Sequence, residues 1–300
     1  MLTHVAAHNE KADCMGDPMN SATVSLEEVG GRTLRVAHWR LDEPSDHPPI
    51  LFFNGIGANI EAVAPLAEAM PERGFIIFDM PGVGESPEPV LPYNPFTMCW
   101  TAAQLLDSLG SEEVDVMGVS WGGAMAQHFA LQHGGRTRKL VLAATTPGML
   151  MVPGKWSALS KMVDPRRYVD PNYMNEHFAT LYGGMTRDTK ATARRDHIGR
   201  IKPPSPRGYL YQLIAMLGWT SAPALPFLKK DTLVMMGGDD RIVVPANGKI
   251  LAGLIPNAKL VEFEDGGHLF LLTHSEEAVA EIRAFLDEGG DSLFEILGHG

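Results

Sequence analysis

The sequence predicts an α/β protein in which helices cover both faces of a mostly parallel sheet, and three observations support this fold class. From Ser21 onward, short apolar, β-rich runs alternate with longer segments of helical apolar spacing, which is the order of a parallel sheet with crossover helices. Several of the short runs are continuously apolar, as strands buried on both faces are. The alternation breaks between Pro147 and Pro226, so an insertion interrupts an otherwise regular chain.

The alternating part of the chain supplies the candidate strands and helices. The strands are short runs rich in apolar and β-branched residues, and they span 33–39, 50–53, 75–78, 114–119, 139–143, 232–236 and 259–263. The helices have apolar residues at helical spacing and Gly or Pro near their ends, and they span 60–73, 95–109, 121–133, 246–254 and 275–288.

The length of 300 residues suits one large α/β domain with an inserted subdomain. We assign residues 21–146 and 227–290 to the core. Residues 147–226, where Gly, Pro, Met and aromatic residues mix without a strand pattern, are predicted to form an inserted, mainly helical cap, with its clearest helix at 209–219. Residues 1–20 and 291–300 are predicted to be peripheral tails.

The composition argues against several classes of protein. The net charge is −11 and the 25 basic residues are scattered, which disfavours a nucleic-acid partner. Cys14 and Cys99 are the only cysteines, so we expect no disulfide framework and a reducing compartment. No run resembles a secretion signal or approaches the roughly 18 apolar residues of a transmembrane helix. We therefore expect a cytoplasmic protein.

The strongest chemical motif is Gly-Val-Ser-Trp-Gly at 118–122, which follows a candidate strand and opens a candidate helix. This is the context in which G-x-S-x-G forms a nucleophile elbow. The two glycines permit a tight turn that holds the serine in strained geometry with its hydroxyl above the sheet. We predict that Ser120 is a nucleophile; the alternative is a serine that only caps the following helix.

A serine nucleophile needs a base, which is usually histidine. His268 is the best placed of the 11 histidines, because it lies in a glycine-flanked loop between the last candidate strand and the terminal helix. Proteins with this elbow carry their base at that point of the chain. The other histidines fall in tails, in loops, in the early strand, in the insertion or on the helix after the elbow. We therefore predict His268 as the base.

The third member of such a triad is a carboxylate that lies between the serine and the histidine in the sequence. Gly-Gly-Asp-Asp at 237–240 follows the candidate strand at 232–236. The pattern Gly-x-x-Asp-x-Ile-Val with a following proline favours Asp240, whose role would be to hold the imidazole tautomer and stabilise the imidazolium. Asp239, which would then cap the turn, stays the alternative because the choice rests on spacing.

Acyl transfer also needs donors for a developing oxyanion. The motif order assigns this role to the backbone amides of Trp121, after the nucleophile, and of Ile56, in the Gly-rich loop 53–59. An ordinary turn is the alternative for that loop. The sequence has no HExxH motif or close His and Cys cluster. Gly82 and Gly84 lack the spacing of a dinucleotide site, so we expect catalysis without a metal or cofactor.

Together these motifs resemble the intracellular medium-chain-length poly(3-hydroxyalkanoate) depolymerases, which are α/β-hydrolases. The resemblance rests on FNGIGAN, DMPGVGES, GVSWGGAMAQ, LVLAATTPG, MVPGK, DPRRYV, LYGG, QLIAMLGWTS and DGGHLFLLT, in that order. It implies the α/β-hydrolase fold, a triad of Ser120, Asp240 and His268, and hydrolysis of 3-hydroxyacyl polyester bonds through an acyl-enzyme. Arg241 departs from the pattern, because proline more usually follows the acid in that family.

The resemblance further implies a hydrophobic polyester or acyl-ester substrate on storage granules. Ligand sites are mostly apolar, and we expect the substrate to be bound by Asn54, Met149, Met151, Trp156, Tyr209, Leu213, Trp219 and Leu269. The alternative for the members from the insertion is that they form the core of the cap. The same triad also suits a carboxylesterase, thioesterase or lactonase acting on small soluble esters. A third alternative is a granule-binding protein with this fold and no activity.

Overall fold

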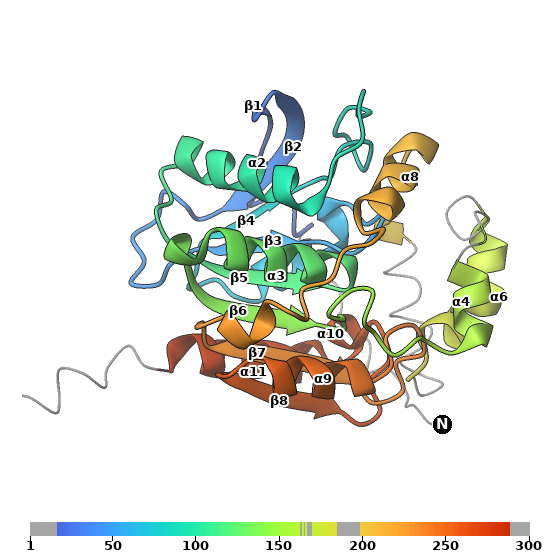
Figure 1. Cartoon of the computed structure of the whole chain (residues 1–300). Coiled ribbons are helices and arrows are strands. Elements are labelled where there is room, and N and C mark those ends of the chain that lie inside the picture. The colour runs from blue at the N-terminus through green and yellow to red at the C-terminus, as the bar shows by residue number, and fades with distance from the viewer. Residues whose placement is uncertain (1–16, 163, 165, 167–169, 185–198, 289–300) are drawn as a thin grey trace, which may run out of the picture.

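A single mixed sheet lies at the centre of the protein (Figure 1). The computed structural model describes residues 17–162, 164, 166, 170–184 and 199–288. Almost all of the two predicted tails lies outside these residues. The strands follow the spatial order β1-β2-β4-β3-β5-β6-β7-β8. Their bounds are β1 (Thr23–Val29), β2 (Arg32–Trp39), β3 (Ile50–Phe53), β4 (Phe75–Phe78), β5 (Val114–Val119), β6 (Thr137–Ala143), β7 (Thr232–Gly237) and β8 (Ala258–Phe263).

Strand direction divides the sheet into two parts. β1 pairs antiparallel with β2, and β2 pairs antiparallel with β4. All the other neighbouring strands pair parallel, from β4 through β3, β5, β6 and β7 to β8. The loops that follow these parallel strands therefore gather at one edge of the sheet, which is where open α/β sheets bind ligands.

Helices cover both faces of the sheet, which confirms the predicted fold class. Side chains alternate between faces along a strand, so Val116 of β5 packs in one apolar layer and Met117 in the other. The first layer lies under α2 (Pro95–Ser108), α3 (Trp121–Gln132) and α9 (Ala246–Leu254). The second lies under α1 (Ala64–Glu68), α10 (Phe270–Thr273) and α11 (Ser275–Asp287).

The structure differs from the predicted elements most clearly at β1 and at residues 60–73. β1 was not predicted, because its sequence, TVSLEEV, includes two glutamates and only its last residue is buried. An edge strand with one solvated face carries little of the apolar signal that marks central strands. The predicted helix at 60–73 is instead the short turn η1 (Ile60–Ala62) followed by α1. Pro71 accounts for the early end, because the residue before a proline is disfavoured in helical conformation.

Between β6 and β7 the chain leaves the sheet and forms α4 (Trp156–Met162), α6 (Pro171–Tyr182) and α8 (Pro206–Ala215). In Figure 1, α8 and the pair of α4 and α6 lie to the right of the sheet. The predicted helix at 209–219 begins earlier, because the Ser205 side chain caps the first turn and Pro206 occupies N1. Among the described residues, no helix is both long and apolar enough to cross a bilayer.

Candidate active site

Ser120 lies at the sharp turn between β5 and α3. Its backbone has φ 55° and ψ −120°, a conformation that costs a non-glycine residue on the order of 1–3 kcal/mol. The turn is held because the Ser120 amide donates to the Ala143 carbonyl over 2.9 Å and the Thr145 hydroxyl donates to the Ser120 carbonyl over 2.7 Å. The Ser120 side chain makes no capping hydrogen bond to α3. The helix-cap alternative is therefore wrong.

The two glycines of the elbow are required by close backbone contacts. A Cβ at position 122 would overlap the carbonyl oxygens of Phe53 and Asn54, at the end of β3. A Cβ at position 118 would overlap the Gly122 carbonyl. Side chains at these positions would push α3 away from the sheet, so the glycines set how closely the serine turn packs against β3.

Ser120, His268 and Asp240 form a continuous hydrogen-bonded chain. His268 Nε2 lies 3.0 Å from Ser120 Oγ, and His268 Nδ1 lies 2.7 Å from Asp240 Oδ2. The three residues follow β5, β8 and β7 respectively. With the carboxylate ionised, Nδ1 donates to Asp240 and Nε2 is free to accept the serine proton. Both distances are within hydrogen-bond reach, which a general base needs toward the proton that it removes.

Asp240 is buried and its orientation is fixed. The residue is 1% exposed. Its Oδ1 accepts the amides of Ile242 over 2.9 Å and Val243 over 2.8 Å, while Oδ2 faces the histidine. The structure therefore brings Asp240, rather than its neighbour, against the imidazole.

Asp239 points to a different set of partners. Its carboxylate accepts the Gly184 amide over 2.9 Å and forms ion pairs with Arg241 over 3.0 Å and Lys155 over 3.3 Å. Burial by itself raises the pKa of the Asp239 carboxyl, but these three donors outweigh it and hold the pKa at about 2. Asp239 thus ties the loop after β7 to the 147–226 segment, and Arg241, which departs from the family pattern, takes part in this contact.

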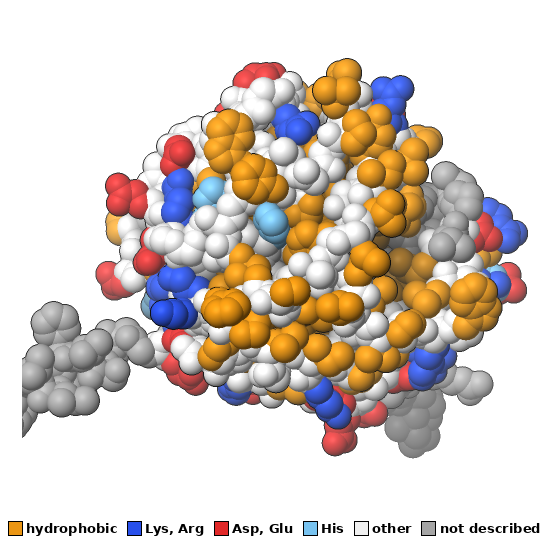
Figure 2. Space-filling view, in the orientation of Figure 1, with side chains coloured by type: hydrophobic (Ala, Val, Ile, Leu, Met, Phe, Trp, Pro, Cys, Tyr) orange, Lys and Arg blue, Asp and Glu red, His pale blue; other side chains and the backbone are white. Residues whose placement is uncertain are grey.

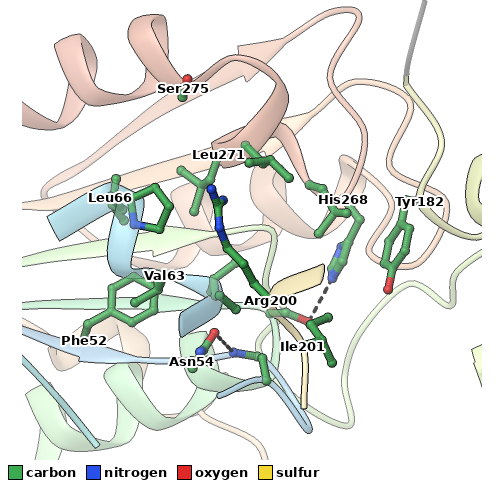
Figure 3. A pocket seen from close by; sticks show the side chains of 18 of the residues that line it. Phe52, Asn54, Val63, Leu66, Tyr182, Arg200, Ile201, His268, Leu271 and Ser275 are labelled. Carbon is green, nitrogen blue, oxygen red and sulfur yellow. Dashed lines mark hydrogen bonds between the residues drawn. The ribbon is translucent and has the colours of Figure 1, made fainter. Parts of the chain in front are cut away.

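Tyr182, at the end of α6, lies against the histidine and was not predicted. The His268 amide donates to the Tyr182 carbonyl over 2.8 Å. The two rings are nearly parallel, with an interplanar angle of 11° and centroids 6.4 Å apart (Figure 3). The signal in the sequence was the LYGG motif, because Gly183 and Gly184 both have positive φ and pass close to the loop that carries His268.

Gln212 of α8 connects the two segments that carry the predicted oxyanion donors, and it also was not predicted. Its Oε1 accepts the Gly57 amide over 2.9 Å, next to Ile56. Its backbone carbonyl accepts the indole N–H of Trp121 over 2.9 Å. Trp121 is the first residue of α3, where amides have no partner within the helix. Gln212 is fully buried, so this connection is shielded from water.

A cavity of about 700 Å³ opens beside the triad. Ser120 and His268 form part of its wall, together with the predicted residues Ile56, Asn54 and Leu269. The lining is mostly apolar, with side chains from α1, α11 and the 147–226 segment, and includes Val63, Leu66, Met162, Met174, Ile201, Ile242, Leu271 and Val279. Figure 3 shows Val63, Leu66, Ile201 and Leu271 of this lining beside His268.

Six predicted substrate-binding residues do not line this cavity: Met149, Met151, Trp156, Tyr209, Leu213 and Trp219. Met149, Met151, Trp156 and Leu213 are 47–80% exposed, and the Trp219 indole donates to His128 Nδ1 over 3.1 Å. Helix geometry explains Leu213, because it is adjacent to the inward-facing Gln212 and successive side chains turn by about 100°. Apolar character alone did not distinguish the inner face of the segment from its outer face.

Comparison with known proteins identifies the family. Residues 50–282 match the alpha/beta hydrolase family. The chain belongs to this family. The structure also contains, within its described residues, no group of three or more His, Cys, Asp and Glu side chains arranged to hold a metal ion.

Relatives of this alpha/beta hydrolase confirm the resemblance predicted from its motifs. It is 45% identical over 241 residues to the poly(3-hydroxyalkanoate) depolymerase of Ectopseudomonas oleovorans, an alignment that covers 80% of this chain and 84% of the relative. It is 29% identical over 226 residues to 2-hydroxymuconate semialdehyde hydrolase of Pseudomonas putida, covering 72% and 78%. The crystal structure of the enol-lactonase from Burkholderia xenovorans LB400 superposes with a TM-score of 0.76, covering 88% of this chain and 100% of the lactonase. At 21% identity, that likeness shows the shared fold.

Proposed function

We propose that this hydrolase cleaves the ester bonds of poly(3-hydroxyalkanoate) or its oligomers, with Ser120 as nucleophile, His268 as general base and Asp240 as the orienting acid. The observation that carries the proposal is the hydrogen-bonded chain of these residues at the wall of an apolar cavity. The 45% identical relative, a poly(3-hydroxyalkanoate) depolymerase, supports the choice of substrate.

The proposed reaction has two steps. His268 Nε2 takes the Ser120 proton as Oγ attacks the ester carbonyl carbon. The resulting oxyanion accepts hydrogen bonds from the backbone amides of Ile56 and Trp121. The imidazolium, stabilised by Asp240, then gives its proton to the departing alkoxide and leaves an acyl-enzyme. In the second step His268 removes a proton from water, which attacks the acyl carbon. The acid leaves, and Ser120 regains its proton.

We propose that residues 147–226 act as a cap and present an apolar patch to granules in the cytoplasm. The patch consists of exposed apolar side chains that contribute nothing to the described core, namely Met149, Leu150, Met151, Leu213, Ile214 and Leu217, which are 43–83% exposed. Two parts of the chain meet there, because the Met149 amide donates to the Trp219 carbonyl over 2.9 Å. Figure 2 shows hydrophobic side chains gathered on this face of the molecule. Apolar surface of this kind typically marks an interaction site.

The test compares dispersed medium-chain polyester with a short p-nitrophenyl ester, using the wild type and Ser120→Ala. We expect the wild type to release soluble 3-hydroxy acids from the polyester and to be labelled by a fluorophosphonate, and the variant to do neither. Rapid turnover of the short ester with intact polyester would instead indicate an esterase or lactonase for small substrates. Absence of both labelling and turnover in the wild type would favour a protein that binds granules without catalysis.

A further inference from the structure

The Arg200 side chain extends into the mostly apolar cavity. Arg200 lines the same cavity as Ser120 and His268, and Figure 3 shows its side chain reaching between Leu66 and Leu271. Arg200 is half-buried, and most of the side chains that line the cavity with it are apolar. Partial shielding from water strengthens the interaction of a guanidinium with an anion.

The backbone of Arg200 is anchored to the core loop that follows β3. The Asn59 side chain is fully buried. Its Nδ2 donates to the Arg200 carbonyl over 3.0 Å, and its Oδ1 accepts the Lys202 amide over 3.1 Å. Asn59 thus forms hydrogen bonds with the backbone on both sides of residue 201. These bonds fix where the Arg200 side chain enters the cavity.

The Arg200 guanidinium has no hydrogen bond or ion pair with any residue that the structure describes. The next two cationic residues along the chain do have carboxylate partners. Lys202 pairs with Glu61 over 3.0 Å, and Arg207 pairs with Glu88 over 3.5 Å.

Two further charged side chains border the cavity. Arg283 is bound by Glu72 over 3.0 Å, and Glu276 forms no ion pair with Arg200. Among the described residues that line this cavity, Arg200 is therefore the cation that is available to a ligand.

We infer that Arg200 binds the free carboxylate of the substrate, so that the hydrolase acts on acid-terminated oligoesters from the carboxyl end. This inference rests on the proposed function. A guanidinium matches a carboxylate with two parallel hydrogen bonds and does not lose its charge at any working pH. An interior unit of a polyester has no such group, so the arginine distinguishes chain ends from chain interiors.

The chemistry of a linear 3-hydroxyacyl polyester determines which product leaves. The terminal carboxylate belongs to the unit that supplies the alkoxide of the last ester bond. When Ser120 attacks that bond, the carbonyl carbon forms the acyl-enzyme and the C–O bond to the terminal unit breaks. His268 protonates the alkoxide, and the terminal 3-hydroxy acid leaves with its carboxylate. Water then hydrolyses the acyl-enzyme, which yields an oligomer shorter by one unit.

The experiment compares the dimer of a 3-hydroxyalkanoate as the free acid with the same dimer as its methyl ester, following cleavage of the internal ester bond by chromatography. We expect the wild type to prefer the acid. Arg200→Gln should lose roughly 10- to 100-fold in kcat/KM on the acid, mainly through KM, because hydrogen bonds to charged groups are strong. Its activity on the methyl ester should stay within about twofold. Arg207→Gln, a matched control outside the cavity, should behave as the wild type on both substrates.

Two outcomes would overturn the inference. One is a wild type that cleaves acid and methyl ester equally well. The other is equal loss on both substrates in Arg200→Gln, which would assign the arginine a structural role; Arg200→Lys, which keeps the charge, should retain part of the preference. If the wild type cleaves neither dimer and no short ester, the proposed function itself fails, which distinguishes that result from the loss of preference alone.

Discussion

The loops that carry Ser120, Asp240 and His268 differ from the neighbouring 147–226 segment in the burial of their side chains. Asp240 and His268 are 1% and 8% exposed and are held by backbone hydrogen bonds. The 147–226 segment instead leaves large apolar side chains in solvent, such as Leu217 at 83% and Met149 at 64%. Under the proposed function this difference separates two tasks, because the buried loops would hold the reacting groups in place and the segment would select what reaches them.

The largest effect should come from the triad. We expect Ser120→Ala and His268→Ala each to lower kcat on a soluble ester by on the order of 10⁴- to 10⁶-fold, because the two residues act as one unit. The double variant should be no worse than either single one. Steady-state kinetics, with thermal unfolding to verify the fold, will check this. Activity near that of the wild type in either variant would contradict the assignment.

A smaller effect should distinguish the two adjacent carboxylates. Asp240→Asn removes the charge beside His268 Nδ1, and we expect kcat to fall by roughly 10²- to 10⁴-fold. Asp239→Asn is the matched control, since it changes the same group one residue away, and kcat should stay within about threefold of the wild type. The measurement is kcat on a soluble ester at constant pH. The opposite ranking would assign the acid to Asp239.

The smallest effect should appear in the 147–226 segment and only on an insoluble substrate. Met149→Ser with Leu217→Ser removes two exposed members of the apolar patch. We expect about a 5- to 10-fold loss of activity on dispersed polyester and no change on a soluble ester. The variant would bury less apolar surface against the polymer, whereas a soluble ester does not contact the patch. Exposed sites have little effect on stability, typically within about 0.5 kcal/mol.

Leu26→Ser, on the edge strand β1, is the control for a patch effect, since Leu26 is 60% exposed but lies in the core domain. It should leave both activities unchanged. Equal losses on the soluble ester and the polyester in the double variant would mean that the patch does not serve surface binding.

The sequence was most informative where a local pattern determines the structure. The strands at 50–53, 75–78 and 114–119 have the predicted bounds, because continuous apolar runs between turns are typical of central parallel strands. The spacing of Ser120, Asp240 and His268 predicted residues that the structure brings together. Their catalytic roles stay predictions until kinetics test them.

The sequence was least informative where contacts join distant parts of the chain. Gln212 contacts Gly57, 155 residues away, and no periodicity marks such a pair. The exposed Leu213 and the buried Gln212 also reverse the usual preference of these residue types. An apolar residue in a cap is buried only if another layer covers it, and that depends on the tertiary arrangement.

The two hydrogen bonds of Gln212 bear on how such hydrolases can be engineered. One side chain of α8 supports the Gly57 amide, and the same residue's carbonyl receives the Trp121 indole. A replacement for the 147–226 segment that lacks an amide side chain at this point would leave the Gly57 amide without its acceptor. A chimera that exchanges this segment should therefore keep Gln212.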